Sequence, residues 1–160
     1  MTDYNKIEIT KVIILDLLHK SGMSGKVEFE ESLTKGLVFN ISSPDSYLLI
    51  GRQGATLHAF QILVQALVSK KLYSQNANEQ PFWFTIDVDD YKQKREWYLK
   101  ETAKGAFEKA KITGRAQGLE PMPNYERRLV HAYLQEHFPE AESYSVDNEP
   151  YRKVVIKVKK

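Results

Sequence analysis

The sequence predicts an α+β protein made of two small units, because helix-like and strand-like patterns follow one another in two groups. Residues 1–88 have the order helix-strand-strand-helix-helix-strand, and residues 89–160 have the order helix-strand-helix-strand-strand. The chain has 160 residues, of which 42% are hydrophobic, so it can supply a packed core to each unit. We find no internal repeat.

In the first group, residues 5–20 carry apolar side chains at helical spacing, and Gly22 follows as a stop signal. Residues 27–30 and 37–41 alternate between apolar and polar, which predicts a β-hairpin. A short helix over 47–50 is followed by a glycine-containing tetrapeptide and a longer helix from 55 to about 72. That longer helix is apolar around much of its circumference, as expected of a helix packed on a sheet. Alternation over 82–88 predicts a third strand.

The second group opens at Asp89 and Asp90, which suit the start of a helix because its first N–H groups favour negative charge. This helix runs to about residue 111, and Gly114 ends it. Residues 118–122 form a short extended piece. Pro123 favours the first turn of a helix over 124–137. Strands around 142–146 and 152–159 flank a predicted turn at 147–150.

Composition and charge limit the kind of protein. The net charge is +2, but it is uneven: residues 1–88 hold 8 Lys/Arg and 9 Asp/Glu, and residues 89–160 hold 15 and 12. Any nucleic-acid binding must therefore come from local placement of charge, with the C-terminal half the more basic. The sequence lacks a signal-peptide pattern and any apolar run of 18 residues, so we expect a cytoplasmic protein without an integral membrane segment.

Metal and cofactor chemistry are not expected. The chain has no cysteine, and its four histidines do not follow a metal-binding spacing. No nucleophile with a base and no Walker-type loop is present. The acidic cluster that comes nearest to a catalytic site is explained by helix capping. It consists of Asp87, Asp89 and Asp90. The sequence therefore predicts a non-catalytic protein without a metal or cofactor.

The first candidate site is the tetrapeptide Gly51-Arg52-Gln53-Gly54, between two apolar helices. Two glycines separated by two polar residues let the backbone approach a sugar-phosphate chain, while Arg52 can meet a phosphate and Gln53 a phosphate or a base edge. The pattern alone is weak, because a tight corner between helices has the same spacing. Residues expected beside the loop, in an apolar groove or partly in the core, are Leu49, Ile50 and Leu57.

The second candidate site lies on the predicted helix 124–137. Arg127 and His131 are one turn apart and share a face, where Arg can bind phosphate and His can bind phosphate or stack on a base. Arg128 adds a further cation. A surface pair tied to Glu126 is the alternative. The last predicted strand carries three lysines, which form either a basic track or a solvated strand edge: Lys153, Lys157 and Lys159.

Together these motifs resemble a known family. Residues 49–54 resemble the IGxxG signature of KH domains, in the helix and strand order of the type II KH fold. Residues 119–131 resemble the R-three-H (RxxxH) domain of the bacterial Jag/KhpB proteins. The resemblance implies a KH domain over 1–88 and an R-three-H domain over 89–160, without the N-terminal Jag domain of many relatives. Gln53 stands where many relatives have a basic residue.

Three functions follow as hypotheses. The resemblance implies first a non-catalytic binder of single-stranded RNA that acts in post-transcriptional regulation linked to cell elongation or division. It also implies a protein-interaction adaptor that pairs with a small single-KH partner, and a homodimer is a further possibility. The third hypothesis is single-stranded DNA binding, because the second domain resembles general single-strand binders.

Overall fold

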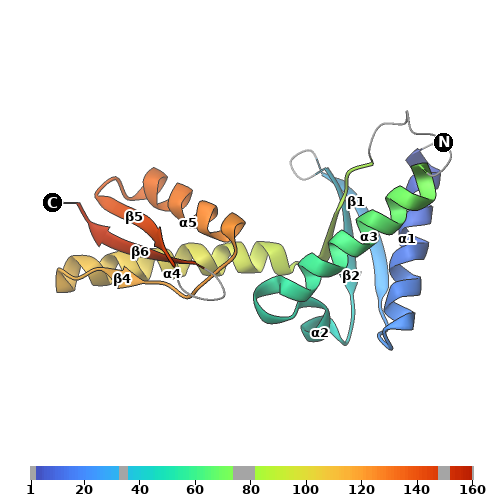
Figure 1. Cartoon of the computed structure of the whole chain (residues 1–160), viewed down its shortest axis with the longest axis horizontal. Coiled ribbons are helices and arrows are strands. Elements are labelled where there is room, and N and C mark those ends of the chain that lie inside the picture. Colours follow the sequence, from blue (N-terminus) through green and yellow to red (C-terminus); the bar gives the residue numbers. More distant parts are fainter. Residues whose placement is uncertain (1–2, 33–35, 74–81, 148–151, 160) are drawn as a thin grey trace. The chain divides into compact units, whose positions relative to one another are not determined.

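The computed structural model describes residues 3–32, 36–73, 82–147 and 152–159, and the chain divides into two compact units, Met1–Lys92 and Gln93–Lys160 (Figure 1). The predicted α+β class and the predicted order of helices and strands are confirmed. The first unit contains α1 (Asp3–Lys20), β1 (Lys26–Ser32), β2 (Gly36–Ser42), α2 (Ser46–Ile50), the 3-10 turn η1 (Arg52–Gly54), α3 (Ala55–Tyr73) and β3 (Thr85–Val88).

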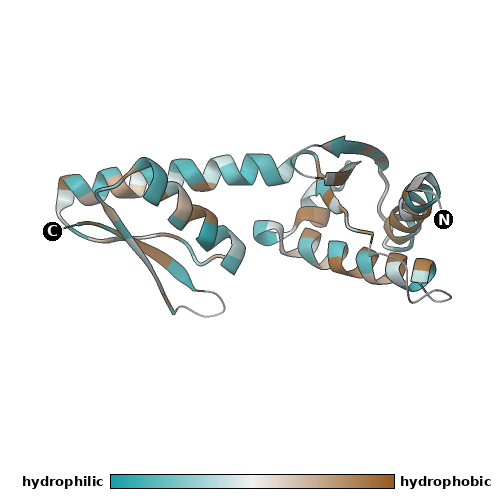
Figure 2. Cartoon of the chain, turned by 90° about the horizontal axis from the view of Figure 1, so that it is seen from above, coloured by the Kyte–Doolittle hydropathy of each residue, from teal (hydrophilic) through white to brown (hydrophobic). Residues whose placement is uncertain are grey.

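The sheet of the first unit has the order β1-β2-β3, with β1 and β2 antiparallel and β2 and β3 parallel. A parallel pair needs a crossover connection, and the segment α2-η1-α3 supplies it. Helices α1 and α3 contact each other and the sheet, and hydrophobic residues recur along both helices (Figure 2). The core between them is closed by buried side chains, among them Ile14, Leu18, Phe39, Ile41, Val64, Val68 and Ile86.

The second unit contains α4 (Tyr91–Thr113), whose first turn starts in the first unit, then β4 (Gln117–Gly118), α5 (Asn124–His137), β5 (Ala141–Val146) and β6 (Lys153–Val158). Its sheet has the order β4-β6-β5, with both pairs antiparallel. The core is formed by buried residues of α4, α5 and the sheet, including Leu99, Phe107, Val130, Leu134, Val154 and Ile156. It fixes α5 beside β5.

Two predicted strands are shorter than expected. The strand predicted over 82–88 begins only at Thr85, and the extended piece predicted over 118–122 is reduced to Gln117–Gly118. Beyond it, the Leu119 N–H still donates to the Val154 carbonyl, at 2.8 Å, so the chain continues along β6. Pro121 has no N–H to donate, which stops a regular ladder there. The turn predicted at 147–150 falls largely outside the described residues.

Two further searches cover only the described part of the chain. None of its helices is both long and apolar enough to cross a membrane. Within the same ranges, no group of three or more His, Cys, Asp or Glu side chains is placed to hold a metal ion.

Candidate nucleic-acid interface

The tetrapeptide at 51–54 adopts a backbone that only glycine accommodates easily at its two ends. Gly51 has φ +67° and ψ −174°, and Gly54 has φ +77°. A Cβ atom at Gly51 would overlap the Thr56 side chain, and one at Gly54 would come within 2.8 Å of the Tyr91 ring. Gln53 is also left-handed, with φ +53°, which costs a residue that carries a Cβ. The loop therefore has a fixed, strained shape before any ligand binds.

The loop offers one mobile charge to a ligand. Arg52 is exposed, and its side chain has no hydrogen bond or ion pair with any residue that the structure describes. Next to the loop, the short helix α2 exposes Tyr47 and Leu48. Sequence reasoning missed these two residues, although their position just before the glycine loop was a signal. Together they give the loop an apolar border of its own.

The expected groove residues lie deeper than predicted. Leu49 and Leu57 are buried in the core of the first unit, and Ile50 is half-buried and packed against that core. Their side chains point toward the sheet, because α2 and the start of α3 cover it. The expectation that Leu49 and Leu57 line a groove is thereby corrected: both support the loop from beneath.

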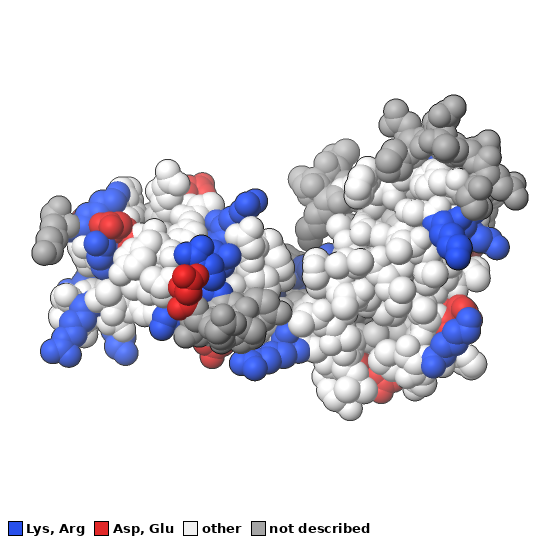
Figure 3. Space-filling model, viewed as in Figure 1, with Lys and Arg blue, Asp and Glu red and all other residues white. Residues whose placement is uncertain are grey.

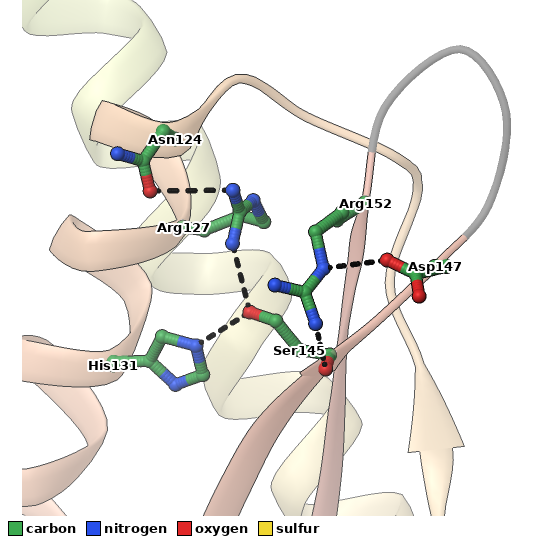
Figure 4. A network of polar contacts seen from close by, with 6 residues as sticks. All are labelled: Asn124, Arg127, His131, Ser145, Asp147 and Arg152. Atoms are coloured by element: carbon green, nitrogen blue, oxygen red, sulfur yellow. Dashed lines mark hydrogen bonds and ion pairs between the residues drawn. The ribbon is translucent and has the colours of Figure 1, made fainter.

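In the second unit, the Arg127 and His131 side chains both point from α5 toward β5, where they meet the same serine (Figure 4). Arg127 Nη1 donates to Ser145 Oγ at 3.1 Å, and Nη2 donates to Asn124 Oδ1 at 3.2 Å. The His131 ring lies between two hydroxyls, with Nδ1 2.7 Å from Ser143 Oγ and Nε2 3.0 Å from Ser145 Oγ. The RxxxH pair is thus held in place before any ligand binds.

The contacts of His131 fit both of its charge states. A serine oxygen has two lone pairs, so Ser145 Oγ can accept from Arg127 and either accept from His131 Nε2–H or donate to a bare Nε2. Burial, and then the charge of Arg127, lower the pKa of His131 below its ordinary value, which favours the neutral imidazole. The resulting site combines one permanent cation with one group able to take up a proton.

One donor in this site lacks a partner. Arg127 Nε is buried and forms no hydrogen bond with the described residues. Buried N–H groups are nearly always paired, because an unpaired one loses its hydration without compensation. Beside His131 lies an open pocket of about 410 Å³, whose lining includes Gln135, Ser143 and Lys159. The pocket borders His131, whereas the buried Arg127 Nε does not line it.

A second arginine fixes the strand that carries the serines. Arg152 Nη2 donates to the Ser145 carbonyl at 2.9 Å, and Arg152 Nε lies 2.9 Å from Asp147 Oδ1 (Figure 4). Sequence reasoning missed Ser143, Ser145 and Arg152 as parts of the site. Alternation along β5 could have placed both hydroxyls on one face, but it could not say that this face meets Arg127 and His131.

The other predicted cations do not all lie beside Arg127 and His131. Arg128 is exposed on α5, and its side chain has no partner among the described residues. Val154 and Ile156 are buried on the helix-covered side of β6, so Lys153 and Lys157 lie on the opposite face. Lys157 there pairs with Glu142 at 3.0 Å. Only Lys159 borders the pocket beside His131, so the three lysines do not form one track with Arg127.

Comparison with known proteins indicates the family of the chain. Residues 98–158, which lie in the second unit, match the R-three-H domain family. The chain is 34% identical over 138 residues to a protein of Clostridium symbiosum, covering 84% of this chain and 57% of that protein. It is 32% identical over 121 residues to one of Lactiplantibacillus plantarum, covering 76% and 35%.

A third relative, from Bacillus subtilis, is 28% identical over 155 residues, which cover 96% of this chain and 71% of that protein. All three relatives carry the name RNA-binding protein KhpB. The chain belongs to this KhpB/Jag family. It spans 57% and 35% of the length of the first two relatives, so it corresponds to part of those proteins.

Proposed function

We propose that this chain binds single-stranded RNA without catalysing a reaction, through an RxxxH site in the second unit and a type II KH loop in the first. The observation that carries the proposal is the preorganised pair Arg127 and His131, which share Ser145 as a hydrogen-bond partner. The name RNA-binding protein shared by the relatives supports RNA as the ligand.

In the second unit, Arg127 and Arg128 supply permanent positive charge, and His131 supplies a proton-accepting imidazole. A phosphate at this site would meet the Arg127 guanidinium through its Nη1 and Nη2 groups, because Nε is buried. The visible face of this unit carries more Lys and Arg than Asp and Glu (Figure 3). This local excess of cations suits a polyanion even though the net charge of the chain is small.

In the first unit, the strained loop 51–54 supports binding of the RNA backbone. Glycine at both ends leaves no Cβ between the backbone and a sugar-phosphate chain, and Arg52 is available to contact a phosphate. We propose that residues 1–88 form the KH domain and residues 89–160 the R-three-H domain. The regulatory role linked to cell elongation or division, and a cytoplasmic location, are parts of the same proposal.

The test measures affinity for an unstructured 15-nucleotide RNA by fluorescence anisotropy over a range of salt concentrations. Arg127→Ala should weaken binding and should lower the slope of log affinity against log salt by about 0.7, the value for one phosphate contact on a single strand. The double variant Arg52→Asp, Gln53→Asp tests the loop without disturbing its glycines. Gly54→Asp would instead collide with Tyr91 and so confuse folding with binding.

The matched control is Lys70→Ala, which removes one exposed cation in the last turn of α3. It should leave the affinity and the salt slope close to those of the wild type. If Arg127→Ala changes affinity and slope no more than Lys70→Ala does, the RxxxH site does not bind RNA. A parallel competition between RNA and DNA of matched sequence tests single-stranded DNA as the ligand.

A separate observation favours an adaptor function as the second candidate. Helix α3 exposes Ile62 and Leu63 one turn from Ala59 and Ala66, so its outer face is apolar. The visible surface of the first unit is largely without charged side chains (Figure 3). Such a face suits pairing with a second KH-type unit, from a small single-KH protein or another copy. Ile62→Glu should abolish pairing in sedimentation measurements after RNase treatment, while RNA binding persists.

A further inference from the structure

We infer that three exposed aromatic side chains in the first half of α4 and at the start of α5 form a stacking surface for unpaired RNA bases in the second unit. This inference rests on the proposed RNA binding. Trp97 is 66% exposed, Tyr98 48% and Tyr125 55%. Aromatic rings of this size are costly to leave in water, which favours a ligand that covers them.

The two tyrosines border one ion pair that ties α4 to α5. Arg95 donates from Nε and Nη2 to the two carboxylate oxygens of Glu126, both at 2.9 Å. The Tyr98 ring lies against this guanidinium, with 5.5 Å from Arg95 Cζ to the ring centroid. The Tyr125 hydroxyl donates to Glu126 Oε1 at 3.4 Å. Both rings are therefore held near the same point, yet about half of each remains in solvent.

The third ring extends this surface along α4. Trp97 and Tyr98 lie three and four residues after Lys94, so the two rings flank Lys94 and point about 100° apart around the exposed side of the helix. Glu101, one turn further on, adds a carboxylate at the far end. None of the three rings belongs to the core of the second unit. Their exposure therefore does not serve the packing of this unit.

The charge around the rings favours RNA over an apolar protein partner as the occupant. Arg128 follows Tyr125 by three residues on the exposed side of α5. The acid at the centre, Glu126, is buried and neutralised by Arg95. Cations beside exposed rings are what single-stranded nucleic acid requires, because phosphates meet the cations while bases stack on the rings.

The Tyr125 ring lies on a different side of α5 from the RxxxH pair. Tyr125 and Arg127 are two residues apart, so their side chains point about 200° apart around the helix, Arg127 toward β5 and Tyr125 toward Glu126 and Arg95. A strand that stacks on these rings would therefore reach the RxxxH site by continuing around α5. The surface supplies affinity without sequence preference, because every base has an aromatic face to stack.

The experiment compares removal of each ring with its retention. Trp97→Leu, Tyr98→Leu and Tyr125→Leu should each weaken binding of the 15-nucleotide RNA by at least about fivefold. Tyr98→Phe and Tyr125→Phe, which keep the ring, should bind nearly as the wild type does. With an abasic 15-mer of the same phosphate number, the leucine and wild-type proteins should bind equally, because no base remains to stack.

A second measurement reports contact directly. In a Trp83→Phe background Trp97 is the only tryptophan, and RNA should quench its fluorescence and protect it from iodide. The stacking surface is excluded if all three leucine variants bind normal RNA with wild-type affinity and RNA does not protect Trp97 from iodide. These rings would then be available to contact a protein partner. The proposed RNA binding would then still stand if Arg127→Ala weakens binding, and would fail separately if it does not.

Discussion

The ion pair between Arg95 and Glu126 allows a quantitative prediction about the stability of the second unit. The Glu126 side chain is 1% exposed and the Arg95 side chain 15% exposed. Arg95→Met removes the cation and both short hydrogen bonds, and among the described residues it leaves the buried carboxylate with the Tyr125 hydroxyl at 3.4 Å as its hydrogen-bond donor. Loss of one partner of a buried pair costs about 3–5 kcal/mol. This is a large part of the about 5–15 kcal/mol that stabilises a typical domain.

The same reasoning predicts rescue by a second substitution. In the double variant Arg95→Met, Glu126→Leu no charge is left buried, so it should be more stable than Arg95→Met alone. Glu126→Leu alone should cost less than Arg95→Met, because Arg95 retains access to water. Urea unfolding, with hydrogen exchange of peptides from residues 93–160, measures each variant. A double variant less stable than Arg95→Met would refute the reasoning that an unpaired Glu126 carboxylate is the dominant cost.

Three further predictions concern the two candidate sites. Gly51→Ala should destabilise the first unit by more than Gly22→Ala in urea unfolding, because both have positive φ but only Gly51 also faces an overlapping side chain. RNA affinity should rise as pH falls from 7.5 to 5, by at most about tenfold per pH unit, since a bound phosphate favours protonation of His131, whose pKa burial lowers. His131→Gln should flatten this profile; an unchanged profile would exclude His131 as its source. In the absence of RNA, the lowered pKa of His131 makes acid destabilise the folded protein. The free energy of unfolding should be highest above the ordinary His pKa and should fall as the pH drops below it. Ser145→Ala should weaken RNA binding several-fold and lower the free energy of unfolding in urea by about 1–3 kcal/mol, because Arg127 and His131 lose their shared partner. Equal affinity would show that this serine does not position them.

Much of this protein could be predicted from local pattern. The helix over 124–137 was predicted with the bounds that the structure has, because Pro123 marks its start and the apolar spacing continues to its end. The glycine loop was predicted from its two glycines together with the order of helices and strands around them, and the positive φ at both gives the physical reason for the glycines. The short strand Gln117–Gly118 was placed less well, because its pairing depends on β6, which lies far along the chain.

The sequence by itself determined the order of helices and strands and the two motifs, since these depend on spacing along the chain. Only the tertiary structure decided which side chains face one another. It buried Leu49 and Leu57, placed Ser143 and Ser145 against His131, and separated Lys153 from the RxxxH pair. Alternation shows that two residues of a strand share a face. Which face meets α5 depends on how the whole core packs.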